Sequence, residues 1–158
     1  MTNFPVFLSV VFVVRNRASQ IESLLAEAAA CVSSFVSDHE LIIVDNASED
    51  ESISVLKKLT GEQGLPNLQV YALTKEVDAD TAAWVGLENA LGDFVAVIDP
   101  MADDIGFLPE MLDNAVSGAD VVFATNEQRA PQSLAYRMAY SAFNGMYIWF
   151  NGIHLAKE

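Results

Sequence analysis

Basic side chains are scarce in this sequence. Lysine and arginine together number 8 against 22 aspartates and glutamates, which gives a net charge of −14 over 158 residues. This balance excludes a nucleic-acid partner, because phosphate binding needs a basic surface. An excess of acidic residues more often serves solubility than a specific function. The length suffices for one domain with a single sizeable core.

Cysteine and long apolar runs are also rare. The one cysteine, Cys31, excludes an internal disulfide and favours a reducing, cytoplasmic setting. The first apolar run, FPVFLSVVFVV at 4–14, is too short to span a bilayer and follows no basic segment, so we interpret it as a buried strand.

Glycine is missing where two nucleotide-binding folds need it. The residues VVRNRAS at 13–19 contain none, which disfavours a dinucleotide-binding or P-loop protein. A nucleotidyltransferase of similar fold is a weaker alternative, because its glycine-rich, basic N-terminal loop is also missing. The sequence has no G-x-S-x-G motif, which would have indicated an α/β-hydrolase.

Short apolar runs alternate with segments of helical periodicity. The predicted strands cover residues 7–14, 41–45, 68–73, 94–99 and 120–125, and the predicted helices cover 21–32, 53–59, 84–91 and 108–115. Ser48, followed by the acidic residues 49–51, predicts the start of the second helix. Near-continuous apolar runs are typical of strands covered on both faces. The pattern predicts an α/β fold: a doubly wound, mostly parallel sheet with helices on both faces.

The last part of the chain has a different pattern. We predict an α/β domain over 1–132 and a helical segment over 133–158, and we expect the chain to be the front part of a longer protein. Aromatic residues recur at steps of three and four along this segment: Tyr136, Tyr140, Phe143, Tyr147 and Phe150. Such a stripe packs on the sheet or on a second copy, giving a homodimer; the alternative is contact with a membrane surface or a lipid acceptor.

Polar residues follow the predicted strands where each strand ends. Ligands of open α/β sheets bind at this edge. The residues are Arg15, Asn16, Arg17, Asp45, Asn46, Lys75, Asp99, Asp103 and Asp104. Cations beside clustered carboxylates suit an anionic ligand carried with a divalent metal, such as a nucleotide diphosphate. The alternative is that these residues are simply polar loops.

Four segments carry a family resemblance: LSVVFVVRN, ELIIVDNASEDES, GLENALGDFVAVIDP and FLPEML. Together, over roughly residues 8–125, they resemble the front of the inverting glycosyltransferases of family 2 type with the GT-A fold. The chain is most similar to the polyprenyl-phosphate, dolichyl-phosphate-like, sugar transferases. The resemblance implies a Rossmann-like nucleotide-binding half that uses a nucleotide-sugar donor.

The resemblance also implies roles for single residues. The stretch Val14, Arg15 and Asn16 matches the segment that lines the base and ribose. Asp45 matches the carboxylate that accepts a hydrogen bond from the base, usually uracil. Asp99 matches the first acid of the D-x-D signature, which holds the metal that bridges the donor phosphates.

The chain departs from the family at two positions. Arg17 stands where the family usually has an acid, and Met101 stands at the second acid of D-x-D. Asp103 occupies the place of a glutamine ligand in the polyprenyl-phosphate branch. Asp99 and Asp103 are therefore predicted to hold Mg²⁺ or Mn²⁺ weakly, because a thioether is a poor ligand for hard cations. A vestigial metal site is the alternative.

These observations predict a glycosyltransferase domain that binds a nucleotide-diphosphate sugar, UDP-linked, for transfer to a polyprenyl-phosphate or saccharide acceptor. The full-length protein would then work in the cytoplasm or at the cytoplasmic face of the membrane, in cell-wall or polysaccharide biosynthesis. The alternative is a catalytically degenerate relative that binds a nucleotide or a protein, which Arg17 and Met101 favour.

Overall fold

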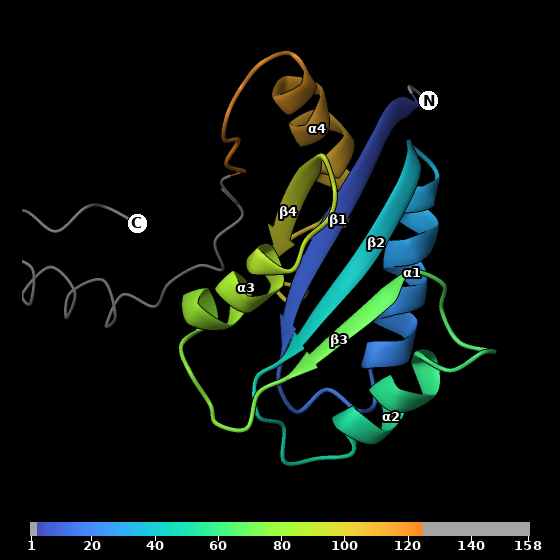
Figure 1. The fold of residues 1–158 in the computed structure, drawn as a ribbon, viewed down its shortest axis with the longest axis vertical. Helices are drawn as coiled ribbons and strands as arrows, with labels where there is room; N and C mark the ends of the chain where they lie inside the picture. Colours follow the sequence, from blue (N-terminus) through green and yellow to red (C-terminus); the bar gives the residue numbers. More distant parts are fainter. Residues whose placement is uncertain (1–2, 125–158) are drawn as a thin grey trace, which may run out of the picture. The chain divides into compact units, whose positions relative to one another are not determined.

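The computed structural model describes residues 3–124 (Figure 1). Within them, four parallel strands form one sheet in the order β3-β2-β1-β4. The strands are β1 (Phe4–Val14), β2 (Val36–Asp45), β3 (Leu68–Ala72) and β4 (Phe94–Ile98). The helices are α1 (Ile21–Ser33), α2 (Ser52–Leu59), α3 (Ala79–Glu88) and α4 (Leu108–Val116), with a 3₁₀ turn η1 (Ile105–Phe107). The doubly wound α/β prediction is confirmed.

The two central strands are apolar on both faces over residues 10–14 and 41–44, where helices cover both sides of the sheet. Successive side chains of a strand point to opposite faces. On β1, Val10 and Phe12 join the larger core with α1, α2 and α4, whereas Val11 joins a smaller core. In that smaller core Ile42, which pairs with Val11, packs against Ala82 of α3. Figure 1 shows α3 on one side of the sheet and α1 and α2 on the other.

A glycine brings α3 close to the sheet. A Cβ added at Gly86 would lie 2.3 Å from a methyl carbon of Val11, so any larger residue would push the helix away. The helix begins at Ala79, and the side chain of the preceding Asp78 caps it by accepting from Thr81 N at 2.9 Å. The expected helix over 84–91 therefore lies earlier, and Leu91 falls beyond its end, 72% exposed.

Two other predictions were wrong in the described residues. The strand expected over 120–125 is absent from 120–124, where Val121 and Phe123 are 68% and 89% exposed. β-Branched and aromatic residues favour a strand only where a neighbouring strand pairs with them. The second helix begins at Ser52, not after Ser48, because Ser48 instead accepts a hydrogen bond from the β1–α1 loop.

The apolar run at 4–14 forms β1, as predicted. Among the described residues, no helix has the length and apolarity needed to cross a membrane. The predicted boundary at residue 132 and the aromatic segment 133–158 lie outside the described residues, so both stay predictions.

Candidate functional site

Loops after β1 and β2 are joined at the carboxyl edge of the sheet. Asn16 donates its backbone N–H to Ser48 Oγ at 2.8 Å, and its side-chain oxygen accepts from Glu49 N at 2.8 Å. Arg17 N donates to Ser52 Oγ at 2.9 Å. Asn16 has a left-handed backbone (φ 53°), which asparagine tolerates better than most residues. The side chains after β2 therefore hold the β1–α1 loop in place.

Asp45 ends β2 with one carboxylate oxygen unused. The residue is 1% exposed and pairs in register with Val14 of β1. Its Oδ2 accepts from Ser48 N at 3.0 Å, whereas its buried Oδ1 has no hydrogen-bond partner among residues 3–124. A buried polar atom without a partner costs free energy, so this oxygen is available to a ligand that donates an N–H or O–H.

Asn46 holds the loop that follows β3. Its Nδ2 donates to Val77 O at 2.7 Å, and its Oδ1 accepts from Val77 N at 3.0 Å. The side chain is 6% exposed, so both polar groups are committed to this loop. Asn46 therefore fixes the position of the β3–α3 loop, and the predicted direct ligand contact would have to break these bonds.

A hollow of about 360 Å³ lies between the β2–α2 and β3–α3 loops. Arg15 spans this hollow: its Nη1 lies 2.8 Å from Glu76 Oε1, and its Nη2 lies 3.9 Å from Glu49 Oε1. Its buried Nε has no hydrogen-bond partner within residues 3–124. Lys75 lines the same hollow and is exposed, as expected of a residue that meets an anion. The sequence analysis did not single out these two glutamates. It could have done so, because Arg15 at a strand end needs an acidic partner.

The β4 end forms a compact acidic turn. Asp103 Oδ2 accepts from Asp99 N at 2.8 Å, and Asp99 Oδ1 accepts from Met101 N at 2.9 Å. Met101 is 56% exposed. Asp104 serves a different purpose, because its side chain caps η1 by accepting from Gly106 N. The turn thus holds the Asp103 carboxylate against the backbone of Asp99.

The donor set of this turn fits a metal held jointly with a ligand. Among residues 3–124, no group of three or more histidine, cysteine or acidic side chains could hold a metal ion. Asp99 and Asp103 each spend one oxygen on a backbone N–H and keep the other. Mg²⁺ is commonly bound by one or two carboxylates together with substrate phosphates. The free oxygens of Asp99 and Asp103 therefore fit a metal site that the phosphates of a bound ligand would complete.

In the described part of the chain, three groups have shifted pKa values. The Ser52 hydroxyl lowers the pKa of Asp50, and the Thr81 hydroxyl lowers the pKa of Asp78, because hydrogen bonds stabilise the ionised carboxylates. Burial raises the pKa of the Cys31 thiol, and Asp104 raises it further. These shifts fall on two carboxylates that accept hydrogen bonds in loops and at a helix start, and on a thiol in α1.

The fold and this edge define a doubly wound α/β protein with an acceptor carboxylate at its ligand-binding side. The family model for glycosyl transferase family 2 matches residues 9–157, and the chain belongs to that family. Its parallel sheet is the one expected of a GT-A fold, so the resemblance seen in the sequence is confirmed.

Curated relatives are similar along most of this chain. The undecaprenyl-phosphate 4-deoxy-4-formamido-L-arabinose transferase of Pseudomonas fluorescens (strain SBW25) is 27% identical over 139 residues, which is 87% of this chain and 40% of that protein. The transferase of the same name from Edwardsiella ictaluri is 28% identical over 141 residues, 89% of this chain and 43% of that protein. The chain thus spans less than half the length of these relatives.

Proposed function

We propose that this chain binds the nucleotide part of a UDP-sugar at the carboxyl edge of its sheet, for transfer of the sugar to a polyprenyl phosphate. The observation that carries the proposal is the buried, unpartnered Oδ1 of Asp45. Family membership supports sugar transfer, and the names of the relatives support the lipid-phosphate acceptor.

The base contact follows from the chemistry of that oxygen. Uracil presents a ring N3–H donor, and a hydrogen bond to an ionised, desolvated acceptor is stronger than one between neutral groups. Cytosine presents a bare N3 acceptor at the same place, which would face Asp45 without a proton. Selection of uracil over cytosine therefore rests on a single carboxylate that Ser48 N holds in orientation.

The diphosphate is assigned to the cationic and acidic groups that flank the base site. Lys75 offers an ammonium group from the β3–α3 loop, and Asp99 with Asp103 offers two carboxylate oxygens. When bound there, Mg²⁺ or Mn²⁺ would neutralise the charge that develops on the leaving diphosphate. With Met101 in place of a second acid, the metal would depend on the phosphates for most of its ligands.

The reaction class is displacement at the anomeric carbon of the donor. A phosphate oxygen of the lipid acceptor forms the new bond to this carbon while the bond to the UDP oxygen breaks. A saccharide hydroxyl as acceptor, and a homodimer through the aromatic segment at 133–158, remain the other predictions for partners. Work at the cytoplasmic face of the membrane would follow from a lipid-phosphate acceptor.

Calorimetric titration tests the binding step directly. We expect UDP to bind more tightly than CDP, and more tightly with Mn²⁺ than without it. Equal binding of both nucleotides would contradict the base assignment. UDP binding without transfer of sugar to undecaprenyl phosphate, measured on the full-length protein, would favour the catalytically degenerate alternative, which Met101 already favours.

A further inference from the structure

Two polar residues interrupt the apolar central strands far from the proposed nucleotide site. Ser9 of β1 and Glu40 of β2 pair in register and are 0% and 4% exposed. Ser9 Oγ donates to Glu40 Oε1 at 2.6 Å. Both side chains point to the face that α3 covers, since they alternate with the residues of the larger core.

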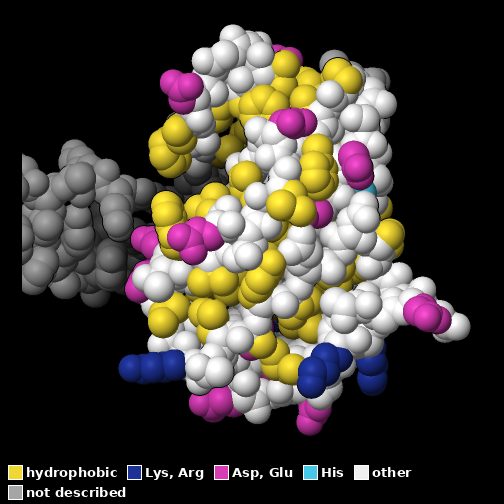
Figure 2. Space-filling model, viewed as in Figure 1, with side chains coloured by type: hydrophobic (Ala, Val, Ile, Leu, Met, Phe, Trp, Pro, Cys, Tyr) yellow, Lys and Arg dark blue, Asp and Glu magenta, His cyan; other side chains and the backbone are white. Residues whose placement is uncertain are grey.

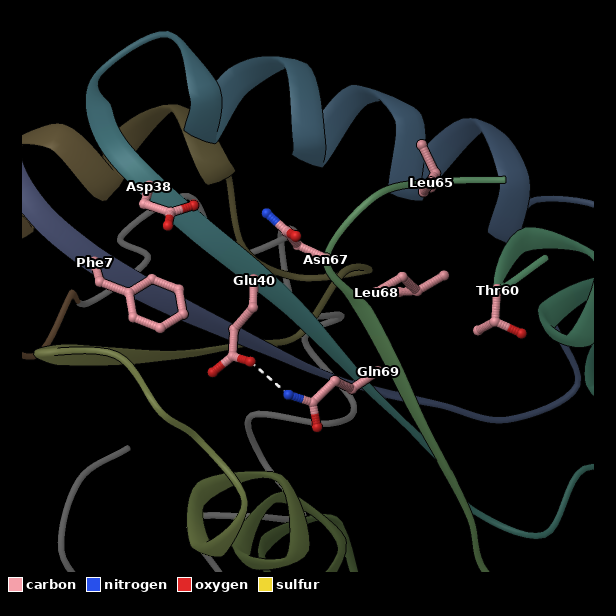
Figure 3. A pocket seen from close by; sticks show the side chains of 8 residues that line it. All are labelled: Phe7, Asp38, Glu40, Thr60, Leu65, Asn67, Leu68 and Gln69. Carbon is pink, nitrogen blue, oxygen red and sulfur yellow. Dashed lines mark hydrogen bonds between the residues drawn. The ribbon is translucent and has the colours of Figure 1, made fainter. Parts of the chain in front are cut away.

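Glu40 is compensated by hydrogen-bond donors. The ion pairs within residues 3–124 both belong to Arg15, so no cation of the described part neutralises Glu40. Instead Gln69 Nε2 donates to Oε2 at 2.5 Å, and Tyr71 OH fixes the other end of that amide by donating to Gln69 Oε1 at 2.8 Å. Figure 3 shows the Glu40 and Gln69 side chains turned toward each other in a hollow of about 340 Å³.

The same two residues capture the connection between α3 and β4. Leu91 N donates to Glu40 Oε1 at 2.7 Å, and Gly92 N donates to Ser9 Oγ at 2.9 Å. The next N–H, of Asp93, donates to the backbone oxygen of Phe7 at 2.8 Å. Three successive amides are thus held by β1 and β2 immediately before β4 begins.

Gly92 shows how closely this connection approaches the sheet. A Cβ at Gly92 would lie 2.7 Å from Ser9 N, 2.7 Å from Ser9 Oγ and 2.8 Å from Phe7 O. Only glycine fits, and the connection has one position against β1. Pairing then continues from Leu8 with Phe94 to Phe12 with Ile98, after which the chain reaches Asp99.

We propose that Glu40 is a positioning residue: its buried carboxylate, with Ser9 and Gln69, locks the α3–β4 connection and so sets where β4 delivers Asp99. The role of Asp99 in this statement rests on the proposed function. The locking of the connection does not, because it follows from the hydrogen bonds of Leu91 and Gly92.

An exchange of partners tests this proposal. Gln69→Glu places a second carboxylate against Glu40 and should break the network. The double variant Glu40→Gln, Gln69→Glu restores it, because the new amide accepts from Ser9 and Leu91 and donates to the new carboxylate, which still accepts from Tyr71. Asp38→Asn is the control for a change of charge in the same hollow. Asp38 lines the hollow and takes no part in the network, and its replacement changes the charge there by one unit, in the opposite sense to Gln69→Glu.

Amide hydrogen exchange reads the connection without any ligand. In Gln69→Glu, protection of the Leu91 and Gly92 amides should fall about tenfold or more, and the Asp99 amide should shift in the NMR spectrum. The double variant should recover both signals, and Asp38→Asn should match wild type. Wild-type protection in Gln69→Glu, or a folded double variant that fails to recover, would overturn the proposal.

Ligand binding separates positioning from general stability. In folded Gln69→Glu, the Mn²⁺-dependent gain in UDP affinity should fall about tenfold to a hundredfold, the usual loss when a group supporting metal ligands is removed. Uridine affinity, which depends on Asp45, should not change. A parallel fall of both affinities would refute the positioning role. If wild type shows no Mn²⁺-dependent UDP binding, the proposed function fails, and the exchange data alone decide whether Glu40 sets the connection and Asp99.

Discussion

Replacing Asp45 with asparagine should change which base the site prefers. The carboxylate is 1% exposed; Oδ2 accepts from Ser48 N at 3.0 Å and Oδ1 is unpartnered. An asparagine in the same rotamer keeps its carbonyl oxygen on the Ser48 N–H, since the flipped amide would set two donors against each other. Its NH₂ group then occupies the place of Oδ1. The variant therefore offers a donor where wild type offers an acceptor.

The size of the change follows from what the exchange leaves unpaired. Uracil N3–H would meet an N–H donor, and an unmatched buried polar group costs about 1–3 kcal/mol. UDP affinity should therefore fall about tenfold to a hundredfold. Cytosine N3 gains a neutral hydrogen bond, worth about 0.5–1.5 kcal/mol, so CDP affinity should rise severalfold.

Calorimetric titration of UDP and CDP at one Mn²⁺ concentration measures both changes. Asp45→Ala serves as the control, because it should weaken UDP by about 1–3 kcal/mol without any gain for CDP. UDP methylated at N3 lacks the same hydrogen-bond donor. Compared with UDP, it should bind more weakly to wild type but not to the variants. Equal UDP affinity in wild type and both variants would remove Asp45 from the site. Weaker UDP binding by Asp45→Asn with no gain for CDP would mean that the new NH₂ group does not face N3 of the base.

Three further predictions concern other parts of the molecule. Met101→Asp should tighten Mn²⁺ binding in the presence of UDP about tenfold to a hundredfold by completing the acidic pair, and unchanged titration would refute the D-x-D assignment. Gly86→Ala should lower the free energy of unfolding by about 1–3 kcal/mol in chemical denaturation, because the added methyl overlaps Val11. Asp78→Ala should destabilise the protein at neutral pH but not at low pH. Because the pKa of Asp78 is lowered in the folded protein, the stabilisation by its carboxylate is present above the usual pKa of 3.8. This stabilisation is lost as the pH falls through the lowered pKa. A deficit that is constant with pH in thermal denaturation would contradict the capping role.

The sequence predicted the central part of the fold because its signals are local. The runs at 7–14 and 41–45 are apolar on both faces, and strands of that kind have few alternatives to a covered parallel sheet. The run at 120–125 is also rich in β-branched and aromatic residues but forms no strand over 120–124, where no neighbouring strand of the described part pairs with it. Composition alone does not show which neighbour a run will find.

The positions of the candidate site residues could be predicted from the sequence, but the contacts that hold their loops could not. Asp45 and Asp99 could be placed at strand ends from the order of strands and helices. The roles of Asn46 and Ser48 could not, because both bind backbone groups of loops that meet only in the folded chain. Glu40 is visible in the sequence as a charged residue directly before an apolar run. Its role could not be inferred, because it binds a connection 51 residues later in the chain.

The position of β1 between β2 and β4 has a consequence for synthesis of the protein. Phe7 at the start of β1 bonds to Asp93, 86 residues further along the chain. A ribosome that adds ~5–20 residues per second needs about 4 to 17 seconds to make that stretch. During this time one edge of the most apolar strand has no neighbour, and such an edge can recruit other nascent chains. The β1 edge that waits for β4 is therefore a part of the chain that needs protection from association while the protein is being made.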